Sequence, residues 1–339
     1  MNVLLTGGAG FIGHHIIEHL WKHTDHNIIS LDRLDTSGTL VRIADIDTFD
    51  TYKSRLKIVH HDLKAEINDF VAHNIGKVDI VLHVAAASHV DRSIEDPMAF
   101  VQDNVVGTVN LLNFVRKKHP HALFLYFSTD EVFGPAPQGV LYKEYDRYNS
   151  GNPYAASKAA AEEMCVAFAN TYRMRTLVTH TMNVFGERQH PEKFIPKIIS
   201  KVLKGETVTI HSDKTRTVPG QRFYIHARNV ASGLVFLLRQ YAYGCLDRIV
   251  ESGYSEKFNV VGEKEVNNLQ LAQLVAEYVG KPLHYEMVDF HSSRPGHDLR
   301  YALCGEKMKQ LGWVPPASFE QSLKTTVNWT LARQAKWLL

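Results

Sequence analysis

The sequence predicts an α/β fold: a doubly wound parallel sheet with a smaller, mixed α/β lobe. Two observations carry this prediction. Short β-branched and apolar runs alternate with helical patterns through residues 1–180, and a glycine-rich turn joins the first run to the first helical stretch. Alternating strands and helices favour a parallel sheet, because each right-handed crossover returns the chain to the same end of the sheet. Ligands of such sheets bind at the carboxyl ends of the strands.

The expected elements follow one another in regular order. We expect strands at 2–6, 27–31, 56–60, 79–84, 123–128 and 176–180. Helical patterns fill the intervals, at 11–23, 64–74, 97–119 and 153–173.

The alternation weakens beyond residue 181. A helix closed by Gly205 is followed by a short strand at 207–211, a polar loop at 213–224 and a further helix ending at Gly280. We therefore expect a first domain over 1–180, to which segments near 223–262 return, and an interleaved second lobe over 181–339.

The composition is that of an ordinary globular protein. Of 339 residues, 45% are hydrophobic and 22% charged. The formal net charge of +2 is too small to indicate that the chain as a whole binds nucleic acid or membranes. No apolar run approaches the ~20 residues that span a bilayer, and the N-terminus lacks the pattern of a signal peptide. Three cysteines without metal or disulfide spacing indicate a reduced, cytoplasmic setting and no metal site.

The segment TGGAGFIG places Gly7, Gly10 and Gly13 between the first strand and the first helix. Glycines there let the backbone approach a pyrophosphate at the positive end of a helix. Asp32 ends the second strand, where a carboxylate accepts hydrogen bonds from the adenosine ribose and repels a 2′-phosphate. This favours NAD over NADP, although the neighbouring Arg33 is a residue type that accommodates the phosphate.

Further cofactor contacts are expected after the first, third and fourth strands. HDL at 60–62 offers a carboxylate near the adenine, and the small residues of VLHVAAAS let a cofactor lie against the end of the fourth strand. Either segment could equally serve packing. The full additional set is Phe11, Ile12, Asp62, Leu63, Ala85 and Ala86.

Tyr154 and Lys158 lie four residues apart at the start of a helical pattern, so both side chains leave the same face. A nearby ammonium is expected to lower the pKa of the tyrosine, which then takes a hydroxyl proton while hydride leaves the same carbon for NAD. The alternative is chance spacing on a helix surface.

FSTDEVFG places Thr129, Asp130 and Glu131 directly after an apolar run. One interpretation is a helix cap with an acidic first turn, with Ser128 or Thr129 as the N-cap. The other is a catalytic group containing a carboxylate pair. Because VFGP ends any helix almost at once, little helix is left to cap, and we favour the catalytic interpretation.

Six segments, in order from residue 1 to about 330, resemble the extended short-chain dehydrogenase/reductases with a Rossmann fold, and among them the dTDP-glucose 4,6-dehydratase family. They are TGGAGFIG, AAASHVDRSI, STDEVFG, NPYAASKA, PEKFIP and RPGHDLRYA. The resemblance implies a hydro-lyase with tightly bound NAD that acts on a nucleotide-diphosphate sugar.

The same resemblance implies a role for each catalytic residue. Tyr154, helped by Lys158 and Thr129, oxidises the sugar at C4. Glu131 then removes the C5 proton, and Asp130 protonates the departing C6 hydroxyl. Return of hydride to C6 gives a 4-keto-6-deoxy sugar.

The resemblance also implies a homodimer and a set of substrate contacts. The dimer pairs the helices near 97–119 and 153–173, which from the sequence alone could equally cover the sheet. The implied substrate contacts are Ser88, Asn183, Lys193, Arg222, Asn259, Arg294 and His297.

Three departures from the family pattern leave the substrate open. They are Ala87, the pair Val184-Phe185, and a more basic loop at 212–229. The nucleotide could be dTDP, UDP, CDP or GDP. Alternative activities are a 5,6-dehydratase without reduction at C6 and a 4-epimerase, and a non-enzymatic NAD-binding regulator is the alternative of a different class.

Overall fold

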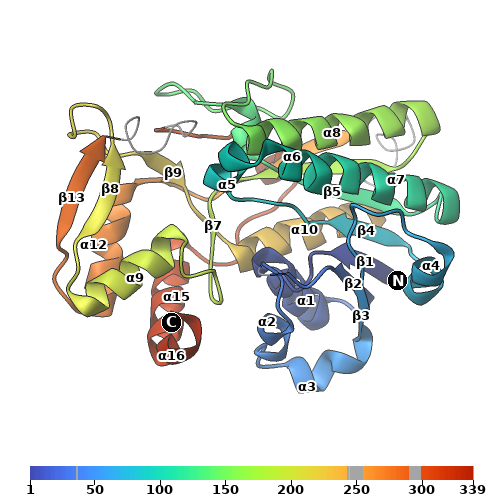
Figure 1. The fold of residues 1–339 in the computed structure, drawn as a ribbon, viewed down its shortest axis with the longest axis horizontal. Helices are drawn as coiled ribbons and strands as arrows, with labels where there is room; N and C mark the ends of the chain where they lie inside the picture. Colours follow the sequence, from blue (N-terminus) through green and yellow to red (C-terminus); the bar gives the residue numbers. More distant parts are fainter. Residues whose placement is uncertain (36, 243, 245–254, 290–298, 339) are drawn as a thin grey trace.

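The computed structural model describes residues 1–35, 37–242, 244, 255–289 and 299–338 (Figure 1). Its central sheet has seven parallel strands: β1 (Asn2–Thr6), β2 (Asn27–Asp32), β3 (Leu56–His60), β4 (Ile80–His83), β5 (Leu123–Thr129), β6 (Thr176–Thr181) and β11 (Glu256–Val260). Their order is β11-β6-β5-β4-β1-β2-β3, so the chain starts inside the sheet and winds outward in both directions. The predicted doubly wound sheet is confirmed.

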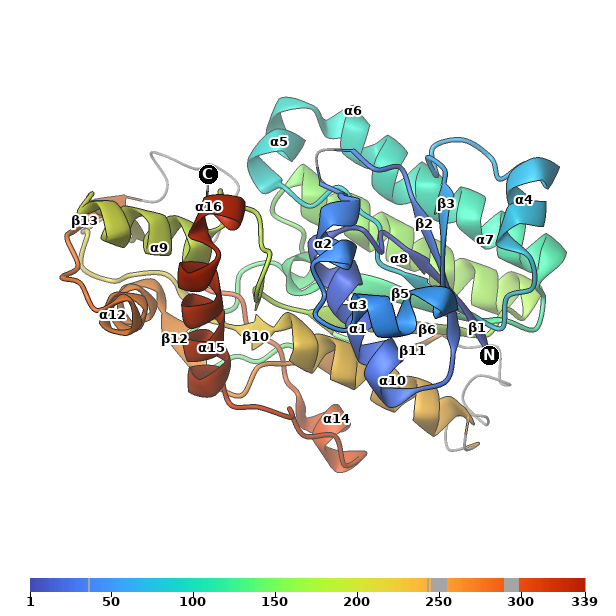
Figure 2. The ribbon, with the colours of Figure 1, turned by 90° about the horizontal axis from the view of Figure 1, so that it is seen from below.

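Helices cover both faces of this sheet (Figures 1 and 2). One face carries α1 (Phe11–His23), α2 (Leu40–Ala44), α3 (Phe49–Tyr52) and α10 (Ala227–Ala242), and the other carries α4 (Asp69–Ile75), α7 (Gly107–Lys118) and α8 (Pro153–Tyr172). Val3 and Leu5 pack with α1 and α10, whereas Leu4 packs with α7 and α8. Because both faces are buried, the strands are continuous apolar runs.

In the first 180 residues, three predicted elements differ from the observed ones at more than one boundary. β4 is one residue shorter at each end than the expected strand at 79–84. The helix expected at 64–74 begins only at Asp69, because the Asn68 side chain accepts a hydrogen bond from Val71 N and caps the helix there. The helix expected at 97–119 is α6 (Pro97–Phe100), a π-helical stretch η2 (Val101–Val106) and α7 in succession, preceded by α5 (Val90–Glu95).

The second lobe has a hydrophobic core of its own. It contains α9 (Phe194–Lys204), α12 (Asn268–Val279) and α15 (Phe319–Ala332), with β8 (Val208–Ser212) parallel to β13 (Tyr285–Asp289). Gly205 and Gly280 end α9 and α12 with φ of +69° and +75°, the left-handed region that favours glycine.

Short elements complete the chain. β7 (Val184–Phe185) pairs with β10 (Ile225–His226), and β9 (Gln221–Phe223) pairs with β12 (Glu265–Asn267). α14 (Glu306–Gln310) packs beside β11, and α16 (Gln334–Trp337) follows α15. Among the described residues, no helix is both long and apolar enough to span a bilayer.

Candidate active site

The glycine turn after β1 is built for close backbone approach. Gly7 has φ of +73°, and a Cβ there would lie 2.9 Å from the backbone of Ala85. A Cβ on Gly13 would lie 2.1 Å from the carbonyl oxygen of Gly7, whereas one on Gly10 would meet only that oxygen, at 3.1 Å. Gly7 thus adopts the positive φ that the turn requires, and Gly13 allows the start of α1 to pack tightly against the turn. Gly10 leaves its backbone accessible to a ligand, which fits a dinucleotide pyrophosphate at the start of α1.

Asp32 fixes this turn to the end of β2. Its Oδ2 accepts a hydrogen bond from Ala9 N at 3.1 Å, and its Oδ1 accepts one from Leu34 N at 2.8 Å. The side chain is buried at the edge of the sheet where a cofactor ribose is predicted. Since each carboxylate oxygen has a second lone pair, the predicted ribose contact is compatible with these bonds.

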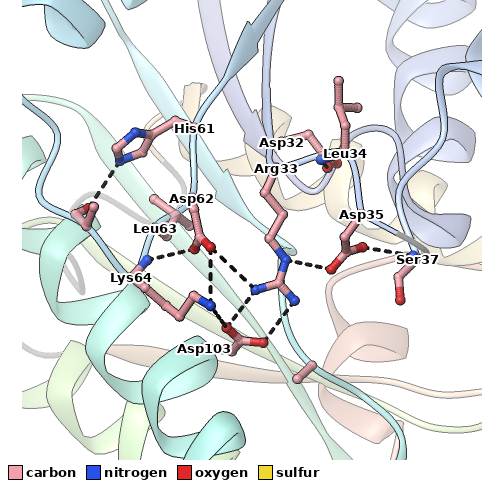
Figure 3. A network of polar contacts seen from close by, with 12 residues as sticks. Asp32, Arg33, Leu34, Asp35, Ser37, His61, Asp62, Leu63, Lys64 and Asp103 are labelled. Atoms are coloured by element: carbon pink, nitrogen blue, oxygen red, sulfur yellow. Dashed lines mark hydrogen bonds and ion pairs between the residues drawn. The ribbon is translucent and has the colours of Figure 1, made fainter.

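The other predicted cofactor residues lie along the same strand edge. Phe11 and Ile12 open α1, and Ala85 and Ala86 follow β4, where Ala85 N donates to the Thr6 hydroxyl at 3.1 Å. Asp62 and Leu63 follow β3 beside Asp32 and Arg33 (Figure 3). Asp62 accepts a hydrogen bond from Lys64 N at 3.0 Å, and Leu63 packs against the core beneath α7.

Tyr154 and Lys158 lie in the first two turns of α8, which Asn152 caps by accepting a hydrogen bond from Ala155 N. Lys158 Nζ donates to the Phe127 carbonyl oxygen at 2.7 Å, and burial lowers the pKa of Lys158 to about 7. Burial, and then the charges of the neighbouring carboxylates, raise the pKa of Tyr154 well above its usual value.

The expectation that Lys158 lowers the pKa of Tyr154 is therefore wrong for this arrangement. The ammonium of Lys158 is directed at a backbone carbonyl, and Glu131 and Asp130 are the charges that act on the tyrosine. A hydrogen bond with Thr129 opposes them by favouring the tyrosinate.

The carboxylate pair lies in η3 (Asp130–Phe133), a single 3-10 turn at the end of β5. Thr129 Oγ1 accepts a hydrogen bond from Glu131 N at 3.4 Å, so Thr129 does cap a short helix. The cap interpretation, which the sequence disfavours, is therefore correct as well, and the same turn holds the clustered catalytic residues. One threonine caps the turn and also contacts both Tyr154 and Asp130.

The two carboxylates have different environments. Asp130 is 4% exposed and accepts a hydrogen bond from the Thr129 hydroxyl at 3.0 Å. Burial first, and the charge of Glu131 second, raise the pKa of Asp130 to about 7. Glu131 is only partly buried and accepts a hydrogen bond from Asn152 Nδ2 at 3.0 Å. Asp130 is therefore partly protonated near neutral pH and can act as an acid.

Two residues that position the catalytic side chains were not predicted from the sequence. The Ser93 hydroxyl accepts a hydrogen bond from Tyr154 N at 3.1 Å. Asn104 joins the loop after β4 to α8, because its side chain bonds both Ala87 and the hydroxyl of Ser157. A buried asparagine within an apolar helical pattern was the available signal for Asn104.

The predicted substrate residues are distributed between the two lobes. Ser88 is exposed after β4, Asn183 is exposed before β7, and Lys193 stands at the N-cap of α9. Arg222, on β9, donates to the Leu299 carbonyl at 2.6 Å and lies 4.7 Å from the Tyr301 ring centre. Its charge lowers the pKa of the Asp130 carboxyl, so Arg222 lies within electrostatic range of the catalytic residues. Arg294 and His297 lie outside the described residues.

Asn259 does not fit its predicted substrate contact. It lies within β11 with no exposed surface. Its amide nitrogen donates to the carbonyls of Tyr142 and Cys304, and its side-chain oxygen is 3.0 Å from His180 Nδ1. These bonds occupy the side chain inside the protein, so we assign Asn259 a structural role.

No cluster of three or more His, Cys, Asp or Glu side chains suited to a metal ion occurs in the part of the chain that the structure describes.

The glycine turn, Asp32 and the Tyr-Lys pair define a dinucleotide-dependent enzyme of the extended dehydrogenase/reductase class. Residues 3–251 match the model of the NAD dependent epimerase/dehydratase family, and the chain belongs to this family. It is 34% identical over 363 residues to the dTDP-glucose 4,6-dehydratase of Salmonella typhimurium, covering 100% of this chain and 94% of that protein.

Solved structures of similar proteins support the same family assignment. A dTDP-glucose 4,6-dehydratase from Streptomyces venezuelae with NAD bound is 31% identical, with a TM-score of 0.84 and coverage of 99% of both chains. The UDP-glucose 4-epimerase of Thermus thermophilus with NAD is 27% identical, with a TM-score of 0.80 and coverage of 97% of this chain and 98% of the other. The predicted NAD cofactor and the predicted dehydratase class are confirmed.

Proposed function

We propose that the protein is an NAD-dependent 4,6-dehydratase of a nucleotide-diphosphate sugar, with dTDP-glucose as the first candidate substrate because the similar dehydratases are named for it. One observation carries the assignment. Hydrogen bonds link Tyr154 through Thr129 to Asp130, and Asp130, with a pKa near neutrality, adjoins Glu131. An epimerase needs only the oxidation at C4, whereas elimination of water needs an acid and a base as well.

The residues divide this chemistry among them. Tyr154, as the tyrosinate that its hydrogen bond with Thr129 favours, takes the proton of the C4 hydroxyl. NAD held by the glycine turn and Asp32 would supply the acceptor of the C4 hydride and, later, its donor to C6. The C4 ketone makes the C5 proton acidic, and Glu131 removes it. Asp130 gives its proton to the departing C6 hydroxyl, which leaves as water.

The proton balance explains the link through Thr129. The C5 position loses a proton to Glu131 and regains one at the end, so Glu131 is restored. Asp130 loses a proton to water, and Tyr154 gains one from the C4 hydroxyl. The hydrogen bonds of Thr129 lie between these two groups, so the proton taken at C4 can restore Asp130.

The test is incubation with dTDP-, UDP-, CDP- and GDP-hexoses, followed by mass spectrometry and NMR of the products. Loss of one water with a 4-keto-6-deoxy product supports the proposal. Isomerisation at unchanged mass contradicts it and favours a 4-epimerase, and a 5,6-ene product contradicts the final reduction at C6.

A double variant tests the assignment of the carboxylates. Asp130→Asn with Glu131→Gln should abolish water loss yet leave reduction of bound NAD by the substrate. The control changes two exposed carboxylates elsewhere, Glu66→Gln with Asp69→Asn. Loss of NAD binding in the first pair would show that Asp130 and Glu131 are structural.

We also infer that residues 1–180, with the segments near 223–262 that return to them, hold NAD, and that the remainder of 181–339 holds the sugar nucleotide. Ser88, Asn183, Lys193, Arg222, Arg294 and His297 are the proposed substrate contacts. The free Cys165 and Cys304 support a reducing compartment, and we propose the cytoplasm.

A homodimer is proposed from exposed apolar side chains near the start of the α7 and α8 pair. Ile94, Met98 and Val101 are 40%, 61% and 37% exposed. Light scattering should give twice the chain mass of 38.4 kDa, and Met98→Glu should lower it toward one chain. A wild-type mass of one chain would contradict the dimer.

A further inference from the structure

Arg33 directly follows Asp32 at the carboxyl end of β2, where an arginine can bind the 2′-phosphate of NADP. In this protein the guanidinium of Arg33 is already bound by carboxylates (Figure 3). Nε donates to Asp35 Oδ2 at 2.6 Å, and Nη1 and Nη2 donate to Asp103 Oδ1 and Oδ2 at 2.7 and 2.9 Å. All three nitrogens therefore have a carboxylate partner.

Asp103 comes from a distant part of the chain. It lies 70 positions after Arg33, in η2, and its side chain is 13% exposed. Two parallel N–H···O bonds to one carboxylate form the strongest and most directional arrangement available to an arginine. The pair thus fixes where the guanidinium points.

The surrounding charge is negative. Asp62 Oδ2 lies 3.9 Å from Arg33 Nη1, and Lys64 Nζ lies 3.4 Å from Asp62 and 3.9 Å from Asp103. Two cations thus face the carboxylates of Asp35, Asp62 and Asp103, with Asp32 beside them (Figure 3). A phosphate group brought to this edge would meet repulsion and would have to displace carboxylates from Arg33.

We propose that Asp103 is a specificity-determining residue for the cofactor: by holding Arg33 in a bidentate ion pair, it withdraws that cation from a 2′-phosphate and directs the site to NAD. Asp32 alone repels the phosphate, but Asp32 next to an unpaired arginine would form a site of mixed preference. The inference rests on the cofactor site and not on the sugar chemistry, so it stands even if the substrate proposed above is wrong.

The experiment compares NAD and NADP on the full-length protein. Wild type and variants are freed of cofactor, and the dissociation constant of each cofactor is measured by calorimetry. Nucleotides that co-purify are also extracted and identified by mass spectrometry. Asp103→Ala should lower the ratio of the NADP to the NAD dissociation constant by about tenfold or more, a change of about 1.4 kcal/mol.

Two further variants assign the effect to Arg33. Asp103→Asn removes the charge but keeps the shape, and it should shift the ratio in the same direction if the alanine variant folds poorly. Arg33→Ala combined with Asp103→Ala should reverse the gain for NADP, because the released cation is gone. Asp69→Ala is the matched control: Asp69 is exposed, pairs with Lys118 at 3.0 Å, and should leave the ratio unchanged.

An unchanged ratio in both Asp103 variants would overturn the proposal. So would an equal loss of affinity for the two cofactors, since that result would show that Asp103 only supports the fold of the site.

Discussion

The Thr129 hydroxyl lies 3.0 Å from Asp130 Oδ1 and is also hydrogen-bonded to the side chain of Tyr154, and its single hydrogen can be donated to either one. Within the described part of the chain, the other carboxylate oxygen, Asp130 Oδ2, is buried without a hydrogen-bond partner. A threonine thus joins the proposed proton acceptor of the oxidation to the proposed acid of the elimination. The free oxygen of Asp130 is the one available to a substrate hydroxyl.

Thr129→Val should remove this link while keeping the shape of the side chain. We expect kcat to fall about 10²-fold, within the range of lost acid–base assistance. Thr129→Ser, which keeps the hydroxyl, should recover most of the rate. Steady-state kinetics of both variants check this, and a loss in Thr129→Ser as large as in Thr129→Val would show that the hydroxyl alone does not account for the role of Thr129.

The rate of water loss should fall as pH rises through about 7. Asp130 must be protonated to give a proton to the C6 hydroxyl, and its raised pKa of about 7 means that the acid form disappears above that pH. The measurement is the pH dependence of kcat for product formation. A rate that stays constant from well below to well above pH 7 would contradict Asp130 as the acid.

Asp130→Asn should stabilise the protein at alkaline pH while it abolishes activity. The pKa of Asp130 is raised from 3.8 to about 7, so its stabilising contribution is fully present below about 3.8 and is lost as pH rises through about 7. Asparagine has no charge to bury, so above pH 7 the free energy of unfolding of the variant should exceed that of the wild type by up to about 4 kcal/mol. Denaturant unfolding at pH 5 and pH 8 should show the larger gain at pH 8, and equal values would contradict the raised pKa.

The strands and the glycine turn could be predicted from the sequence because their signals are local. Apolar runs marked β1 to β6, and glycine spacing marked the start of α1. The charge relationships could not be predicted, because they join distant segments: Arg33 meets Asp103, 70 positions away, and Asn104 meets Ser157, 53 positions away. For the same reason, the hydrogen bond from Lys158 to the Phe127 carbonyl could not be predicted, although the four-residue spacing between Lys158 and Tyr154 can be read directly from the sequence.

Gly13→Ala and Gly10→Ala should separate packing from cofactor binding. A Cβ on Gly13 would lie 2.1 Å from Gly7 O and 2.6 Å from Gly8 Cα. Because these are backbone atoms, which cannot move without distorting the turn, we expect Gly13→Ala to lose about 1–3 kcal/mol of stability and also to lose NAD binding. A Cβ on Gly10 meets only one atom, at 3.1 Å, so that variant should lose NAD affinity with much less loss of stability. Thermal unfolding without cofactor and NAD titration measure the two effects. Equal destabilisation would contradict the separate roles.

Glu162 lies buried one turn beyond Lys158 on α8. Among the charged residues of the described core, we expect its substitution to lower the stability of the protein most. Its side chain has no exposed surface, lies 2.9 Å from Lys257 Nζ and 3.1 Å from His180 Nε2, and accepts a hydrogen bond from Tyr148. Burial alone would raise the pKa of Glu162, but these partners outweigh it and hold that pKa well below its usual value. Its contribution to stability is therefore present above about 4.5, the pKa in the unfolded chain, and is lost as pH falls below that.

Glu162→Gln removes the nearest counter-charge of the buried Lys257 and leaves only the more distant, exposed Glu163, so we expect the free energy of unfolding to fall by about 3–5 kcal/mol at pH 7. Glu163→Gln is the matched control, because Glu163 is 59% exposed and 3.7 Å from the same lysine, and its loss should stay within about 0.5 kcal/mol. Adding Lys257→Met to Glu162→Gln should recover part of the stability, since no unpaired cation then remains. Denaturant unfolding of the three variants gives the comparison. A loss at Glu162 no larger than at Glu163 would show that solvent, and not the ion pair, sets the energy of this cluster.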